Sequence, residues 1–213
     1  MDNKFKNSKF SGDFSSESQK IKANSSAVYL GNNTAICRTV FGNKIYVDTR
    51  DISLSPHLLL DGMWEAWISE AMTRVIRPTM NCVDLGTNFG WYSVLMASRI
   101  GPDGFLIGAD ANPRMVELCR KSMAVNGFYE NSKIHHIAVS DQKGVMEFNT
   151  LQSYMGSGSL SDMGDTATQY SDTIIKHTVA SNTLDALVDG RSIDFMKIDC
   201  EGAEPSIVRG GEN

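Results

Sequence analysis

The sequence predicts an α/β fold with a doubly wound, Rossmann-like parallel sheet. Two observations predict it. Predicted strands alternate with predicted helices from residue 81 onward, and the first of these strands runs into a glycine turn that opens a helix, Asn81–Gly90. Such alternation is typical of a parallel sheet with right-handed crossovers. The chain has 213 residues, of which 41% are hydrophobic, so it is long enough for one main domain.

Two regions precede that domain, which we place at residues 79–213. Residues 1–26 are rich in Ser, Asn, Lys and Asp, and we expect a disordered tail there. Residues 27–78 contain short β-rich pieces and then one amphipathic helical pattern over residues 58–77. We therefore expect an N-terminal β-hairpin and helix cap. Trp64 and Trp67 could line a ligand cleft there, but we expect them to pack against a sheet.

The later elements follow from local signals. A continuously apolar strand, Phe105–Ala109, ends at Asp110, and Asn112 and Pro113 then fit the cap and first turn of a helix. Further strands are predicted near residues 134–139 and 193–198. Between them, residues 145–150 and 173–180 are typical of a hairpin pair around a segment rich in Gly, Ser and Asp, residues 151–172. That segment fits either a binding loop or a surface insertion.

Composition excludes several classes of protein. The net charge is −5 and no run of Lys and Arg stands out, which argues against a nucleic-acid partner. No apolar run approaches the ~18 residues of a membrane span. The N-terminus lacks the apolar core of a secretory signal, so we expect a cytoplasmic protein. Four scattered cysteines are expected to be reduced and mostly buried: Cys37, Cys82, Cys119 and Cys200.

The glycine turn is the first candidate cofactor site. It contains Gly86, Thr87, Asn88 and Gly90, and Asp84 precedes it by two residues. We expect Asp84 at the lip of the crevice, where a carboxylate repels a pyrophosphate and attracts a sulfonium. The middle glycine of a dinucleotide-binding turn is also missing. Both features favour S-adenosyl-L-methionine over NAD.

The ends of the next two strands supply further candidates. Asp110 has the usual position of an acid that binds ribose hydroxyls, although it could instead cap the following helix beside Asn112. Ser140 and Asp141 follow the third strand and are placed for an adenine amino group, although Ser-Asp is also common in turns.

The fourth strand ends in a cluster of ionisable residues. Alternation places Lys197 and Asp199 on the same side of the strand, and the following turn could return Glu201 toward the site. The alternative is a structural ion pair with helix-capping acids. Asp199 or Glu201 is our candidate general base, with three histidines as alternatives, His135, His136 and His177. No metal site is predicted, because Asp199 and Glu201 lack a further ligand at convincing spacing.

These motifs resemble the FkbM-type family of S-adenosylmethionine-dependent methyltransferases from about Asp51 to Asn213. The resemblance lies in VDLGTNFGWYS, ADANP, IAVSD, NTLD and MKIDCEGAEPSIVRGGE. It implies a class I methyltransferase fold and O-methylation of a hydroxyl on a sugar or glycan or on a secondary metabolite. It also implies that Asp84, Gly86, Asn88 and Gly90 hold the methionine portion, Asp110 the ribose, and Asp199 and Glu201 the region near the methyl group. Trp64 and Glu65 match a G-x-x-E helix that closes over the cofactor.

Other readings stay open from sequence alone. A class I sheet has seven strands, so we expect a truncated chain whose fourth strand is an exposed edge. The rival functions are an NAD-dependent oxidoreductase, a catalytically silent adenosyl-binding or interaction module, and N-methylation of an amine or protein. The small-molecule or glycan acceptor and the oligomeric state are not readable from the sequence.

Overall fold

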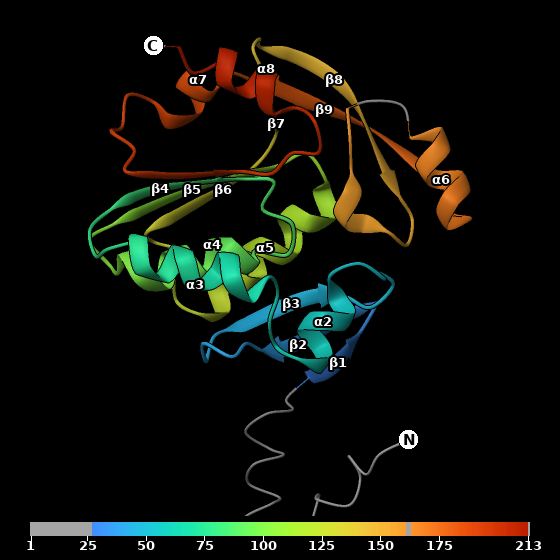
Figure 1. Ribbon diagram of the computed structural model, residues 1–213, viewed down its shortest axis with the longest axis horizontal. Coiled ribbons are helices and arrows are strands. Elements are labelled where there is room, and N and C mark those ends of the chain that lie inside the picture. Colours follow the sequence, from blue (N-terminus) through green and yellow to red (C-terminus); the bar gives the residue numbers. More distant parts are fainter. Residues whose placement is uncertain (1–26, 161–162, 213) are drawn as a thin grey trace, which may run out of the picture.

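A four-stranded parallel sheet forms the centre of the computed structural model (Figure 1), which describes residues 27–160 and 163–212. The strand order is β10, β4, β5, β6, and all neighbouring pairs are parallel. The predicted α/β class with a parallel sheet is therefore confirmed. The strands are β4 (Asn81–Leu85), β5 (Phe105–Asp110), β6 (Ser132–His136) and β10 (Phe195–Ile198).

Helices cover both faces of this sheet (Figure 1). Cys82, Leu106 and Ile134 face the first hydrophobic core, which contains residues of α4 (Trp91–Ile100) and α5 (Pro113–Val125). The alternate residues Val83 and Ile107 face a second core with α7 (Leu184–Val188) and α8 (Glu204–Arg209). The period-2 alternation of a strand explains this division, and burial on both faces explains why the strands are so apolar.

β10 is the edge of the sheet within the described residues, since it pairs with β4 alone. Its four residues are half-buried. The sequence predicted such an edge strand at this point of the chain.

The predicted hairpin after the third strand is present. β8 (Gly144–Leu151) pairs antiparallel with β9 (Ile174–Asn182), and the short β7 (Ala138–Val139) extends this second sheet. The connection between β8 and β9 carries a 3-10 turn, η1 (Met155–Ser157), and α6 (Gly164–Tyr170). Residues 151–172, for which the sequence was compatible with either a binding loop or a surface insertion, therefore contain helical structure of their own.

The N-terminal region contains a three-stranded antiparallel sheet and two short helices. The strands are β1 (Ala27–Gly31), β2 (Thr34–Arg38) and β3 (Lys44–Asp48), and the helices are α2 (Ser55–Leu60) and α3 (Ala66–Val75). The expected tail, residues 1–26, lies outside the described residues. No helix in the described part of the chain is long and apolar enough to span a bilayer.

The single helix predicted over residues 58–77 is wrong. Gly62 has a φ of +64°, and a Cβ there would lie 2.7 Å from the carbonyl oxygen of Arg38, so the chain turns at this glycine. Glu65 is also left-handed, with a φ of 40°, and α3 begins only after it. Trp67 is consequently 74% exposed, and the prediction that it packs against a sheet is wrong too. Helical spacing alone did not reveal this turn, because Gly is tolerated within helical patterns.

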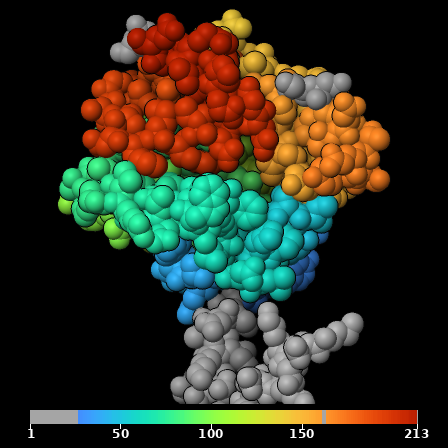
Figure 2. Space-filling view, in the orientation of Figure 1, coloured from blue at the N-terminus to red at the C-terminus, as the bar shows by residue number. Residues whose placement is uncertain are grey.

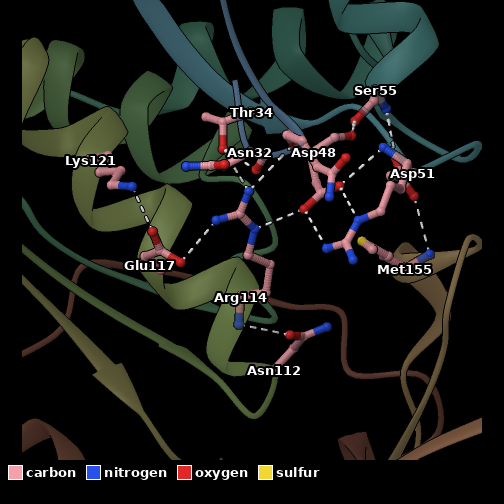
Figure 3. Close-up of polar contacts among 12 residues, drawn as sticks. Asn32, Thr34, Asp48, Asp51, Ser55, Asn112, Arg114, Glu117, Lys121 and Met155 are labelled. Atoms are coloured by element: carbon pink, nitrogen blue, oxygen red, sulfur yellow. Dashed lines mark hydrogen bonds and ion pairs between the residues drawn. The ribbon is translucent and has the colours of Figure 1, made fainter. Parts of the chain in front are cut away.

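A buried carboxylate, that of Asp48, joins the N-terminal sheet to α5 (Figure 3). Its oxygens accept hydrogen bonds from Arg114 Nε at 2.8 Å and from Arg50 Nε and Nη2 at 2.9 Å. Arg114, in the first turn of α5, also donates to the Thr34 hydroxyl at 2.7 Å. Burial acts to raise the pKa of Asp48, but the hydrogen bonds from Arg50 and Arg114 hold it below the usual range.

Asp51 makes a second junction nearby (Figure 3). Its Oδ2 accepts from the backbone N–H groups of Leu54 and Ser55 at the start of α2, at 2.9 and 2.8 Å. Its Oδ1 accepts from the N–H of Met155 in η1 at 3.1 Å. The N-terminal region therefore fixes both the start of α5 and the start of the β8–β9 connection.

We expect Arg114→Met to reduce the free energy of unfolding by about 2 kcal/mol or more, because it removes one of the two charged partners of the buried Asp48. Arg50, the other partner, remains. Urea denaturation measures this change. Lys121→Met is the matched control, since Lys121 pairs with Glu117 on the surface of the same helix and such pairs contribute about 0–1 kcal/mol. Equal losses in the two variants would contradict the proposed junction.

Candidate cofactor site

A cavity opens at the carboxyl ends of β4, β5 and β10, where ligands bind in open α/β sheets. Its empty space is about 910 Å³, a figure that includes open solvent at its mouth. Four of its lining side chains are charged, and three of these are acids: Asp110, Lys197, Asp199 and Glu201. Much of the remaining wall is apolar, including Leu54, Trp64, Met115, Ile137 and Phe148.

The glycine turn forms the floor of this cavity. Gly86 has a φ of +78°, its N–H donates to the carbonyl of Ala109 at 2.9 Å, and a Cβ there would lie 1.9 Å from the backbone oxygen of Asp199. Only glycine fits so close an approach. Thr87 and Asn88 also line the cavity. Gly90 does not; it is left-handed, with a φ of 93°, immediately before α4.

Asp110 occupies the predicted place at the end of β5 and lines the cavity. Its carboxylate accepts hydrogen bonds from the backbone N–H groups of Asn88 and Asn112, both at 2.8 Å. Burial raises the pKa of Asp110, and these hydrogen bonds oppose that shift. Asn112 lines the cavity and caps α5 by accepting from the N–H of Arg114 at 2.9 Å. The carboxylate is thus fixed in orientation beside the turn.

The predicted position of Asp84 at the lip of the crevice is wrong. Its side chain is fully buried and is absent from the cavity lining. Strand alternation turns Asp84 to the same face as Cys82, toward α4, where its Oδ2 accepts from the Ser93 hydroxyl at 2.6 Å. Burial raises its pKa, while Lys197 and Ser93 oppose the shift. Asp84 therefore lies beneath the site and does not face a ligand.

Lys197 connects the buried acid to the cavity. Its ammonium lies 3.6 Å from Asp84 Oδ1 and 3.3 Å from Asp199 Oδ2, and donates to the carbonyl of Gly86 at 3.3 Å. It also lies 4.8 Å from the ring centre of Tyr92, a cation–π distance. Burial alone would lower the pKa of Lys197, but the carboxylates of Asp84 and Asp199 raise it above its usual value. The position of the Lys197 ammonium is therefore set by four groups: the carboxylates of Asp84 and Asp199, the carbonyl of Gly86 and the ring of Tyr92.

A tight turn after β10 presents the last acid. Glu201 is left-handed, with a φ of 48°, a conformation that costs on the order of 1 kcal/mol or more for this residue type. Glu204 stabilises the turn, because its carboxylate accepts from the N–H groups of Cys200 and Gly202 at 2.7 and 2.9 Å. Burial, followed by the charges of Asp199 and Glu204, raises the pKa of Glu201. Glu204 was not among the site residues predicted from the sequence.

Besides Asp84 and Gly90, three further predicted residues lie outside the cavity lining. Ser140 is buried and Asp141 pairs with Arg209 at 3.0 Å, so the structure does not bring them to the cavity to meet an adenine. Glu65 is also outside, although Tyr92, which lines the cavity, donates its hydroxyl to the Glu65 carboxylate. Trp64, the neighbour of Glu65, lines the cavity and also packs against the first hydrophobic core.

The three histidines that were alternative candidates for the base lie away from this site. Neither His135, His136 nor His177 lines the cavity. His136 Nε2 lies 3.1 Å from the carbonyl of Ala111, and His177 Nε2 lies 3.0 Å from the Thr150 hydroxyl. Within residues 27–160 and 163–212, no group of three or more His, Cys, Asp or Glu side chains is arranged to hold a metal ion.

The sequence missed the contribution of the β8–β9 region. Phe148, Met155, Gly156, Gly158 and Leu160 all line the cavity. Gly158 is needed there, since a Cβ would lie 2.3 Å from the ring of Phe148. The only available signal was the Gly- and Ser-rich composition of the connection, which is compatible with a binding loop but does not reveal where the loop lies.

Comparison with known proteins places these features in a family. The model of the methyltransferase FkbM domain matches residues 84–213. An arsenite methyltransferase of Halobacterium salinarum is 33% identical over 69 residues, which are 30% of this chain and 18% of that protein. A demethylmenaquinone methyltransferase of Symbiobacterium thermophilum is 31% identical over 68 residues, 32% of this chain and 27% of that protein. The chain thus spans less than a third of the length of either relative.

Solved structures show only partial likeness. A SAM-dependent O-methyltransferase of Thermotoga maritima matches 56% of this chain and 51% of its own, at 14% identity and a TM-score of 0.36. An O-methyltransferase of Bacillus cereus in complex with SAH matches 34% of each chain, at 11% identity and a TM-score of 0.32. Neither likeness carries an argument about the function of this chain.

We expect Gly86→Ala to reduce the free energy of unfolding by more than about 3 kcal/mol, because the new methyl group would overlap the backbone of Asp199 in addition to straining φ. Gly127→Ala is the matched control. Gly127 has the same φ of +78° but nothing within 4 Å of its Cβ, so its loss should be about 1–2 kcal/mol. Urea denaturation of both variants measures the difference, and similar losses would contradict the close approach.

We expect Lys197→Met to cost about 3 kcal/mol of unfolding free energy at neutral pH, because Asp84 then lacks its counter-ion. An acid whose pKa is raised in the folded state gains stability as the pH falls and it takes up a proton. The difference between wild type and variant should therefore narrow at acid pH. Urea denaturation across pH measures this, with the exposed Lys176→Met as control. A difference independent of pH would contradict the role given to Asp84.

Proposed function

This chain belongs to the FkbM methyltransferase family, and from that premise we propose that it binds S-adenosyl-L-methionine in the cavity and methylates a hydroxyl group. The observation that carries the proposal is the charge of the cavity wall, which has three carboxylates and a single ammonium. A positively charged sulfonium is attracted to such a wall, and the pyrophosphate of NAD is repelled. Asp84 does not line the cavity, so Asp110, Asp199 and Glu201 take the role that the sequence prediction assigned to it. The missing middle glycine of the turn still favours S-adenosylmethionine over NAD.

The residues of the cavity fit this cofactor. The carboxylate of Asp110, held by two backbone N–H groups, retains acceptor capacity for ribose hydroxyls. The close approach of Gly86 to Asp199 leaves the floor free of side-chain bulk. Apolar residues such as Ile137 and Phe148 provide a surface for a base. Ser140 and Asp141 stay outside this assignment, because they do not line the cavity.

The role of the chain in methyl transfer is to orient the acceptor and to take up a proton. When bound, S-adenosylmethionine supplies a methyl group on a sulfonium, whose C–S bond breaks as the acceptor oxygen bonds to carbon. Glu201 accepts the proton that the acceptor hydroxyl loses. Its raised pKa brings it closer to the pH at which a general base works best. Asp199 is the weaker candidate, because the ammonium of Lys197 already lies 3.3 Å from it.

We extend the proposal to the substrates and partners of the whole protein. We assign the acceptor to the hydroxyls of a sugar or glycan or of a secondary metabolite, in a protein without a nucleic-acid partner and working in the cytoplasm. The acidic wall supports only the class of the donor. N-methylation is the nearest alternative, in which the acids would position a cationic acceptor.

Isothermal titration calorimetry with S-adenosylhomocysteine, S-adenosylmethionine and NAD tests the proposal. We expect binding of the first two and none of NAD. Asp110→Ala should weaken S-adenosylhomocysteine binding by roughly 10–100-fold, the equivalent of a lost hydrogen bond to a charged group. Asp103→Ala, an exposed acid in the loop before β5, is the control.

The outcomes separate the rival functions. Tight NAD binding without adenosyl binding would establish an oxidoreductase and overturn the proposal. Adenosyl binding without transfer of a labelled methyl group to any hydroxylated acceptor would favour a silent binding module. Thermal unfolding of Asp110→Ala shows whether lost binding reflects lost folding instead.

A further inference from the structure

A second pocket lies beside the cofactor cavity, under the connection between β8 and β9. The described residues of its wall carry hydroxyl, amide, thioether and aromatic groups and one carboxylate: Tyr154, Ser157, Ser159, Met163, Thr166, Gln169, Tyr170 and Glu201. The rings of Tyr154 and Tyr170 are stacked, with centroids 4.4 Å apart and an angle of 16° between their planes. The pocket thus combines an aromatic surface with hydrogen-bonding groups.

The wall of this second pocket is anchored to the rest of the fold. Asp172 accepts hydrogen bonds from the N–H groups of Ser153 and Tyr154 at 2.8 and 3.0 Å. Asp51, in the N-terminal region, holds the N–H of Met155 at 3.1 Å. These hydrogen bonds hold the backbone that carries Tyr154, and the stacking of Tyr154 on Tyr170 joins that segment to α6. A wall residue ordered before binding reduces the entropy lost on binding.

Glu201 belongs to both pockets. Figure 2 shows the C-terminal segment, in red, meeting the β8–β9 region, in orange, on the face in view. Ser159 donates to the carbonyl of Glu201 at 3.4 Å across this junction. Glu204 holds the turn that carries Glu201. The proposed base therefore stands where a ligand of the second pocket would adjoin a ligand of the first.

The charge of the second pocket narrows the class of its ligand. No Lys, Arg or His is among the described residues that line it, and Glu201 is its one charged lining residue. An anionic ligand such as a phosphate or carboxylate would meet a carboxylate without a counter-ion. An uncharged ligand with several hydroxyls would find the hydroxyls and the amide as hydrogen-bonding partners and the tyrosine rings as an apolar surface.

We propose that this second pocket is the acceptor subsite and that it selects uncharged polyhydroxylated acceptors against anionic ones. The inference rests on the proposed methyl transfer for its catalytic meaning. The binding itself does not depend on that transfer, so the two are tested separately.

Saturation-transfer NMR tests the subsite with two matched probes, methyl α-D-glucopyranoside and glucose 6-phosphate, each with S-adenosylhomocysteine present. We expect the neutral glucoside to bind and the phosphate to bind roughly tenfold more weakly, because of the charge of Glu201. Tyr170→Ala and Gln169→Ala should each reduce the glucoside signal severalfold. Tyr129→Ala, which removes a 64% exposed tyrosine elsewhere on the surface, should not.

A gain-of-function variant tests the charge argument without relying on loss. Thr166→Lys adds a cation to the wall and should raise the binding of glucose 6-phosphate relative to the glucoside. The proposal is overturned if neither probe binds, if the phosphate binds as well as the glucoside to wild type, or if Tyr170→Ala and Gln169→Ala leave the glucoside signal unchanged.

The same samples distinguish the two proposals. Tyr154 and Tyr170 do not line the cofactor cavity, so S-adenosylhomocysteine binding should persist in Tyr170→Ala and reports an intact fold. Adenosyl binding without glucoside binding removes the subsite and leaves the proposed cofactor in place. Glucoside binding without adenosyl binding removes the proposed cofactor and leaves the subsite.

Discussion

The cofactor site depends on the ion pairs that the ammonium of Lys197 makes with Asp84 and Asp199. The ammonium lies between the fully buried Asp84 and the cavity-lining Asp199, and it donates to the backbone of the glycine turn at Gly86. It therefore joins β10 to β4 at the carboxyl end of the sheet. A buried charge is costly without a partner. Asp84 on β4 and Lys197 on β10 therefore depend on each other. Of the acids that line the cavity, Asp199 takes part in this pairing, whereas Asp110 and Glu201 lie outside it.

The N-terminal region has a structural part in the same site. Asp48 holds Arg114 at the start of α5, beside Asn112 and Asp110, and Asp51 holds the start of η1. The cofactor cavity and the second pocket thus share one support, although their residues are far apart in the sequence. A region that resembles a peripheral cap in the sequence fixes the position of both walls.

Glu201 lies where the two pockets adjoin. Its left-handed backbone is held by Glu204, and Glu201 lines both the acidic cavity and the hydroxyl-rich pocket beside it. Strained residues of this kind are characteristic of functional sites. The cavity has a wall suited to a cationic donor, and the adjoining pocket has a wall suited to a neutral acceptor.

The sequence alone was enough to predict the parallel α/β sheet, the β8–β9 hairpin, the glycine turn, Asp110 at the end of β5, and Lys197 and Asp199 on one side of their strand. These follow from strand periodicity, turn residues and the rule that the carboxyl ends of parallel strands meet. Which face of β4 Asp84 occupies, whether Gly62 interrupts a helix, and where Ser140, Asp141 and the β8–β9 connection lie all depend on contacts between distant segments. Local patterns carry no information about such contacts, so Asp84 was predicted at the lip of the crevice and is found beneath it.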